Sequence, residues 1–170
     1  MVKNLSAQHS LVSNWVSQLR DVEVQNDRMR FRRNLERIAE VIGYEISKEL
    51  EMEEKEITTP MGQATCKVLK EQPVLGTILR AGLAMHNGLL NYFDKADSAF
   101  VAAYRKHSTI DDSFQINQGY VTCPNLEGRT LILADPMLAT GASLIMALEE
   151  LHEYGQPSEV HIVVAIACTE

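Results

Sequence analysis

The amino-acid sequence predicts an α/β fold, with a mainly parallel sheet and helices on both of its faces. Apolar runs of strand length alternate along the chain with segments whose apolar residues keep helical spacing, which is typical of parallel β-α units. These runs are short and mostly apolar, as expected for strands that are covered on both faces. The predicted strands of the sheet cover residues 74–79, 99–104, 131–133 and 160–167.

Length and charge limit the classes of function. A chain of 170 residues is expected to form a single domain with its own core, helical over residues 1–50 and with a ligand-binding core over residues 57–170. Its 16 basic and 23 acidic residues give a net charge of −7, which disfavours a nucleic-acid partner. No apolar stretch approaches the length of a membrane span, and the start MVKNLSAQHS is not a secretory signal, so we expect no membrane partner.

The cysteines and histidines favour a cytoplasmic protein that holds no metal of its own. Cys66, Cys123 and Cys168 are odd in number, scattered and outside C-x-x-C spacing, which predicts reduced thiols. The five histidines include no pair at metal-ligand spacing, so a zinc site is not expected.

Two helices are predicted to form an amino-terminal extension. Leu11, Trp15 and Leu19 are four residues apart and predict a short helix that packs onto the rest of the protein. Asp27 is a candidate N-cap for a second helix that runs to residue 50. The apolar stripe of this second helix consists of Phe31, Leu35, Ile38, Ile42 and Ile46.

The second helix also carries a basic run, Arg28, Arg30, Arg32 and Arg33. Such a run can bind an anion, but a solvated or subunit-contacting face is the more common use and is favoured here.

Residues 51–79 are expected to form several short elements. We predict a charged connector over 51–56, a strand over 57–59 that Pro60 stops, a brief helix over 61–70 and a strand over 74–79.

The turn after residue 79 is a candidate diphosphate site. Arg80 stands at the tip of the strand, and Ala81-Gly82 turn the chain into a helix that carries Leu83, Leu89, Leu90 and Phe93. A guanidinium donates to two oxygens, and small neighbours let backbone N–H groups approach an anion. Taken alone, a surface arginine beside a turn is the simpler interpretation. No G-x-G-x-x-G or G-x-x-x-x-G-K-[ST] motif occurs, so neither a dinucleotide fingerprint nor a P-loop is supported.

The next strand, 99–104, is closed by another arginine, Arg105. His107 is interpreted as a solvated loop histidine, 109–113 as a polar turn, and 114–122 as a β-hairpin arm.

Residues 130–154 carry the most informative pattern. An apolar strand ends at Asp135, a loop of small residues follows, and a helix then shows Leu144, Leu148 and Leu151 at helical spacing. The loop and the first turn of the helix offer backbone N–H groups and the positive end of the helix dipole to a phosphate. Asp135, at the carboxyl end of the strand, can bind hydroxyl groups. The pattern therefore predicts a sugar-phosphate site, and the alternative is an ordinary strand-to-helix loop.

These segments resemble one known family. The sequence DPMLATGAS, residues 135–143, is similar to the phosphoribosyl-pyrophosphate (PRPP) signature DPMLATGGS of the uracil phosphoribosyltransferases. It departs at Ala142, which should fit unless the backbone there needs a positive φ. ILRAG and the following Gly88-Leu89-Leu90 resemble the pyrophosphate loop of the family, and AAYRKH resembles its LYRD or LYRH segment. The similarity extends over essentially the whole chain.

The resemblance implies a type I phosphoribosyltransferase fold and a glycosyltransferase of pyrimidine salvage, in which uracil and PRPP give UMP and pyrophosphate. It implies Asp135, Arg80 and Arg105 as catalytic residues, Mg²⁺ carried in by PRPP rather than held by the protein, and a homodimer or larger assembly. The implied PRPP-binding residues are Arg80, Ala81, Gly82, Arg105, Asp135, Pro136, Met137, Leu138, Ala139, Thr140, Gly141, Ala142 and Ser143.

The uracil-binding segment of the family, Y-I-V-P-G-L-G-D-A-G-D, has no match here. Either the chain is a fragment of a longer enzyme, which we favour, or the protein has lost its base pocket and is inactive as it stands.

Three alternatives remain: a PRPP-sensing regulator that binds RNA, a non-catalytic PRPP-binding subunit, and an enzyme for another base. The first is disfavoured because Ala134 precedes Asp135 where such regulators carry a paired acid of the V-D-D-V type.

Overall fold

The structure is a computed structural model that describes residues 2–107 and 114–168, with side chains other than those of 103–107 and 114–119. Its centre is a five-stranded sheet in the order β5-β4-β3-β6-β8. The strands are β3 (Val74–Leu79), β4 (Asp97–His107), β5 (Phe114–Thr122), β6 (Thr130–Ala134) and β8 (Glu159–Val163). All neighbouring pairs are parallel except β4 and β5, so the predicted mainly parallel sheet is confirmed.

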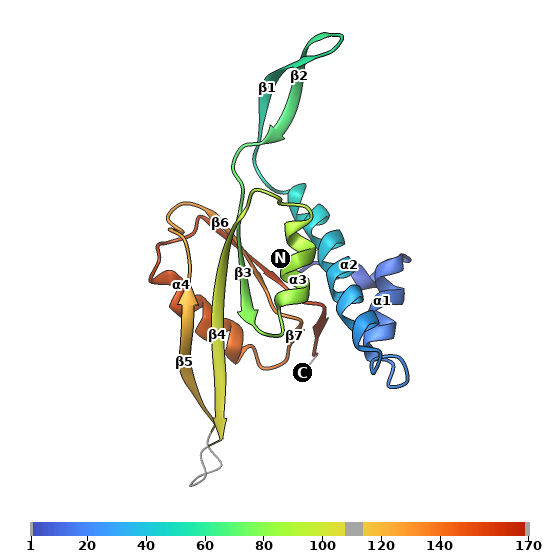
Figure 1. The fold of residues 1–170 in the computed structure, drawn as a ribbon, viewed down its shortest axis with the longest axis vertical. Helices are drawn as coiled ribbons and strands as arrows, with labels where there is room; N and C mark the ends of the chain where they lie inside the picture. Colours follow the sequence, from blue (N-terminus) through green and yellow to red (C-terminus); the bar gives the residue numbers. More distant parts are fainter. Residues whose placement is uncertain (1, 108–113, 169–170) are drawn as a thin grey trace.

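Helices cover both faces of this sheet, as predicted. On one face lie α1 (Leu11–Arg20), α2 (Arg28–Ser47) and α3 (Leu83–Leu90), and on the other lies α4 (Ala142–His152) (Figure 1). Alternate residues of β6 pack against the helices on opposite faces of the sheet. Ile132 belongs to the apolar cluster with α1–α3, whereas Leu131 and Leu133 belong to the cluster with α4. Both faces of the strand are buried from Leu131 to Ala134, and these four residues are all apolar.

The amino-terminal helices form largely as predicted. The side chain of Asp27 accepts a hydrogen bond from the backbone N–H of Arg30 at 3.0 Å, which confirms it as the N-cap of α2. In α1, however, Val12, Val16 and Leu19 are the buried residues, and Leu11 is 66% exposed. The predicted stripe of α1 was therefore wrong by one position in its first turn.

Within residues 51–70, the predicted strand 57–59 forms as the end of a longer strand, but the predicted connector 51–56 and brief helix 61–70 were wrong. The connector joins the predicted strand in β1 (Met52–Thr59), and the brief helix is instead β2 (Gly62–Leu69). The two strands form an antiparallel hairpin that projects from the body of the molecule (Figure 1). Pro60 and Met61 lie between the paired ends Thr59 and Gly62, and Gly62 has a φ of +130°. The proline thus begins a tight turn instead of ending an isolated strand.

The β-hairpin arm predicted at residues 114–122 is β5, and its partner strand is β4. This pairing extends β4 to His107, so two local interpretations were wrong. Arg105 does not close the strand but lies within it, opposite Ile116, and His107 belongs to the strand and not to a loop. The predicted polar turn at 109–113 lies outside the described residues.

The predicted final strand, 160–167, is two strands. β8 ends at Val163, and β9 (Ile166–Ala167) pairs in parallel with β7 (Met137–Leu138) in a separate two-stranded sheet. Since β7 lies inside the segment that resembles the PRPP signature, the second piece of the strand lies beside the predicted site.

Two composition-based expectations concern residues that the structure describes. The three cysteines are free thiols. Among the helices of the described residues, none combines the length and the apolar character needed to cross a membrane.

Candidate active site

The site is built where two neighbouring parallel strands end. β3 and β6 are paired with Thr77 opposite Ala134, so the turn that follows β3 and the loop that follows β6 start side by side. Arg80 stands at the end of the first strand and Asp135 at the end of the second. The carboxyl ends of parallel strands are the usual place for ligands in open α/β sheets.

A cavity of about 340 Å³ lies between these two segments. Ala81 lines it together with Ile78 and Leu79 from the end of β3. The other lining residues come from the second loop and the start of α4: Asp135, Pro136, Met137, Ala139, Thr140, Gly141, Ala142, Ser143 and Leu144. The structure therefore brings together most of the residues that the sequence places in a PRPP site.

Three of the predicted site residues whose side chains are described, Arg80, Gly82 and Leu138, do not line this cavity. Arg80 is exposed between two lining residues, Leu79 and Ala81, and its peptide bond to Leu79 is cis. Leu138 is half-buried in β7. Gly82 is buried at the end of the turn. The side chain of Arg105 lies outside the described residues.

Gly82 allows the turn after β3 to pack against β6. Its N–H donates to the carbonyl oxygen of Ile78 at 2.9 Å. A Cβ at this position would lie 2.9 Å from the carbonyl oxygen of Ala134 and would overlap the hydroxyl of Thr77. Only glycine fits this close approach without displacing the backbone.

Gly88, in contrast, belongs to helix packing. It lies in α3, and a Cβ there would collide with the carbonyl oxygen of Glu36 and lie 2.9 Å from the Cβ of Ala39, both in α2. The resemblance of Gly88-Leu89-Leu90 to the family thus corresponds to the contact between α2 and α3, whereas the turn at the cavity ends at Gly82.

A geometry suited to an anion lies at the start of α4. Gly141 is the N-cap of this helix with a φ of +77°, and Ala142, Ser143 and Leu144 of its first turn line the cavity. The hydroxyl of Thr140 accepts a hydrogen bond from the N–H of Ala142 at 3.4 Å. The first turn of a helix combines backbone N–H groups that lack helical partners with the positive end of the dipole, an environment that suits an anion.

Asp135 is half-buried at the wall of the cavity. Its N–H donates to the carbonyl oxygen of Val163 at 3.0 Å, which continues the pairing of β6 with β8 by one residue. This bond fixes the backbone of Asp135, so that its carboxylate lies at the carboxyl end of β6.

The segment after β8 supports the same loop, and sequence reasoning missed it. The carbonyl oxygen of Pro136 accepts from the N–H groups of Ala165 and Ile166, both at 3.1 Å, and that of Leu138 accepts from the N–H of Cys168 at 2.9 Å. Backbone pairing of this kind leaves no side-chain pattern in the sequence. Thr77, which is buried in β3 and bonds to the carbonyl oxygen of Ala134, was also missed, although a polar residue inside the run VLGTIL was a signal.

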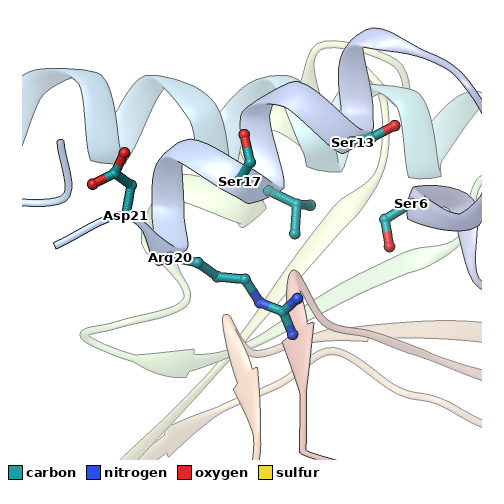
Figure 2. A pocket seen from close by; sticks show the side chains of 6 residues that line it. Ser6, Ser13, Ser17, Arg20 and Asp21 are labelled. Carbon is teal, nitrogen blue, oxygen red and sulfur yellow. The ribbon is translucent and has the colours of Figure 1, made fainter. Parts of the chain in front are cut away.

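A second hollow, of about 400 Å³, lies along α1 (Figure 2). Its lining residues are Ser6, Ser13, Val16, Ser17, Arg20 and Asp21. The hydroxyl of Ser13 donates to the carbonyl oxygens of Gln8 and Ser10, and that of Ser17 to Asn14. Because these hydroxyls already bond to the local backbone, this hollow shows no arrangement for chemistry.

Burial shifts the pKa of two groups away from the cavity, Cys123 and His86, toward the neutral form. Burial raises the pKa of the Cys123 thiol to about 11, so the thiolate needed for a nucleophile is scarce at neutral pH. Burial also lowers the pKa of His86, whose Nε2 lies 3.1 Å from the hydroxyl of Ser98.

Comparisons with known proteins give a consistent result. The model of the family described as uracil phosphoribosyltransferase matches residues 6–170. The uracil phosphoribosyltransferase of Porphyromonas gingivalis is 48% identical over 166 residues, which cover 98% of this chain and 76% of that protein. The enzyme of the same name from Ligilactobacillus salivarius is 35% identical over 164 residues, covering 95% and 75% of the two chains.

Solved structures agree in fold. The AQ2163 protein from Aquifex aeolicus superposes with a TM-score of 0.77 at 27% identity, covering 98% of this chain and 87% of that chain. A hypoxanthine phosphoribosyltransferase from Staphylococcus aureus gives a TM-score of 0.51 at 15% identity, covering 80% and 74%, a likeness that concerns the fold alone.

Proposed function

Because the chain belongs to the uracil phosphoribosyltransferase family, we propose that it transfers the phosphoribosyl group of PRPP to uracil, giving UMP and pyrophosphate. Among the residues, the main support for this proposal is that the turn after β3 and the loop after β6 line one cavity. The turn at Ala81 and the loop Asp135–Ser143 come from adjacent strand ends and line the same space. PRPP carries a diphosphate at one end of a ribose and a phosphate at the other, so it needs two such segments.

In this reaction, N1 of uracil forms a bond to C1′ of the ribose while the bond from C1′ to the pyrophosphate oxygen breaks. The electron pair of that bond leaves with pyrophosphate, and the proton of N1 passes to solvent. Positive charge develops on the ribose ring and negative charge on the leaving group. Such a step depends on positioning and on charge stabilisation more than on a nucleophilic side chain.

The loop at the start of α4 is assigned to the 5′-phosphate of PRPP. Its small residues and the first turn of the helix point toward the cavity and offer backbone donors to an anion. Asp135, at the same wall, is assigned to the ribose hydroxyls. Its negative charge also favours the cationic ring of the transition state.

Arg80 is assigned to the leaving pyrophosphate. It stands on the turn that closes the other side of the cavity, and its exposed side chain is available to a ligand. Arg105 is assigned the same role on the family resemblance alone. Mg²⁺ is proposed to enter bound to the diphosphate oxygens of PRPP, the hard ligands that this ion prefers.

The direct test is UMP formation from labelled uracil, PRPP and Mg²⁺. The expected result is UMP that appears only when all three are present. Tight PRPP binding without any UMP would instead indicate a PRPP-binding protein and would contradict the proposed enzyme.

A cytoplasmic location and a homo-oligomeric state are part of the proposal. Free thiols at Cys66, Cys123 and Cys168 support a reducing compartment.

The projecting β1–β2 hairpin supports self-association because it exposes apolar side chains, with Met61 97% exposed. Light scattering on the purified protein measures the subunit number, and a monomer at all concentrations would contradict the second part.

A further inference from the structure

Thr77 is a polar residue in the middle of an apolar strand. β3 reads VLGTIL, and Thr77 is completely buried in it. Its hydroxyl donates a hydrogen bond to the carbonyl oxygen of Ala134 at 3.2 Å. Buried polar groups need such partners, and this one lies on the neighbouring strand β6.

The same hydroxyl also contacts the turn after β3. A Cβ placed on Gly82 would overlap the Thr77 hydroxyl and would lie 2.9 Å from the carbonyl oxygen of Ala134. Thr77, Gly82 and Ala134 therefore meet at one buried point, and each comes from a different part of the site.

This point lies directly beneath both ligand-binding segments. Ala134 immediately precedes Asp135, and Gly82 immediately follows Arg80 and Ala81. A shift of the Thr77 side chain would change the distance between the turn and the loop, because its hydroxyl is packed against the first and bonded to the second.

We propose that Thr77 is a positioning residue that sets the separation between the diphosphate turn 80–82 and the ribose-phosphate loop 135–143. The inference rests on the proposed function, since it assumes that PRPP spans the two segments. Inorganic pyrophosphate occupies only the first segment and ribose 5-phosphate only the second. A ligand with two linked ends gains affinity only when both sites lie at the matching distance.

The test measures binding of these three ligands by calorimetry in the presence of Mg²⁺. Thr77→Val keeps the shape of the side chain and removes the hydroxyl. The expected result is that PRPP affinity falls about tenfold, whereas pyrophosphate and ribose 5-phosphate each change by less than about twofold. Thr77→Ser keeps the hydroxyl and is expected to retain PRPP affinity within about threefold of the original protein.

Thermal melting shows whether each variant is folded at the assay temperature. Ile132→Val removes a buried methylene from the middle of β6 and is the control for a loss of stability that does not involve the Thr77 contact. It is expected to leave the affinities for all three ligands unchanged. If Thr77→Val does not fold, Thr77→Ala carries the same expectation.

Three outcomes would overturn the inference: unchanged PRPP affinity in Thr77→Val, an equal loss for PRPP and for one of the half-ligands, or a Thr77→Ser variant as weak as Thr77→Val. Failure of the original protein to bind any of the three ligands would overturn the proposed function as well. The two failures can be told apart: the proposed function fails in the original protein, whereas the inference about Thr77 fails only through the results for the variants.

Discussion

Gly141 has a φ of +77°, whereas Ala142, the residue after it, begins helix α4 without a positive φ. The conformation that only glycine adopts easily is therefore needed at the first position and not at the second. This chain departs from the DPMLATGGS signature at Ala142, the position that needs no positive φ and therefore accepts a residue other than glycine.

This pair gives a matched prediction. Gly141→Ala should weaken PRPP binding and lower the free energy of unfolding by about 1 kcal/mol, because an L-residue is strained in the left-handed region. Ala142→Gly should leave PRPP affinity within about twofold, since no conformational demand changes there. Calorimetry and urea unfolding on both variants check this, and a larger effect from Ala142→Gly than from Gly141→Ala would contradict it.

Arg80→Ala should lower kcat/KM by an amount equivalent to about 2 kcal/mol or more, roughly thirtyfold, because a charged donor to the leaving group is lost. Arg80→Lys should recover only part of this, since an ammonium lacks the planar fork. Steady-state rates of UMP formation measure both.

Arg32, exposed on α2, provides the control for the loss of one positive charge. Arg32→Ala should leave kcat/KM nearly unchanged. An Arg80→Ala enzyme with the original kcat/KM would reject the leaving-group assignment.

Asp135→Asn should reduce turnover far more than it weakens the binding of inorganic phosphate. The carboxylate is assigned to the ribose and its developing charge, whereas phosphate is assigned to the first turn of α4. The measurements are kcat for UMP formation and the dissociation constant of phosphate on the same preparation. Losses of the same size in both would show that Asp135 acts through the loop as a whole.

His86 should make the stability of the protein fall in mildly acidic solution. Burial lowers its pKa in the folded state, so the unfolded chain binds more protons than the folded chain as the pH falls. The neutral histidine contributes to the free energy of unfolding. This contribution is fully present above the pKa of the unfolded chain, about 6.5, and is lost as the pH falls toward the lower pKa of the folded protein.

Urea unfolding between about pH 8 and about pH 5 measures this effect. The variant His86→Gln, which carries no titratable ring, should be less stable at pH 8 but should show a smaller decline on acidification. An identical decline in both proteins would mean that other groups cause it.

Much of this protein was determined by local sequence. Strand 74–79, the N-cap Asp27 and the helix that starts at Ala142 depend on the period of apolar residues and on capping chemistry within a few positions. The nine residues of DPMLATGAS identified the family, which the comparisons confirmed. The roles assigned to Asp135, Arg80 and Arg105 remain predictions.

Tertiary structure decided what depends on pairing between distant segments. The β1–β2 hairpin, the extension of β4 past Arg105 and the division of the last strand into β8 and β9 all follow from registers formed between backbones. Such hydrogen bonds use backbone groups that every residue except proline carries in full, so the side-chain pattern of the sequence does not mark them. The contact of Thr77 with Gly82 and Ala134 is of the same kind: its position is set by how β3 and β6 pair, and only the folded chain brings the three residues together.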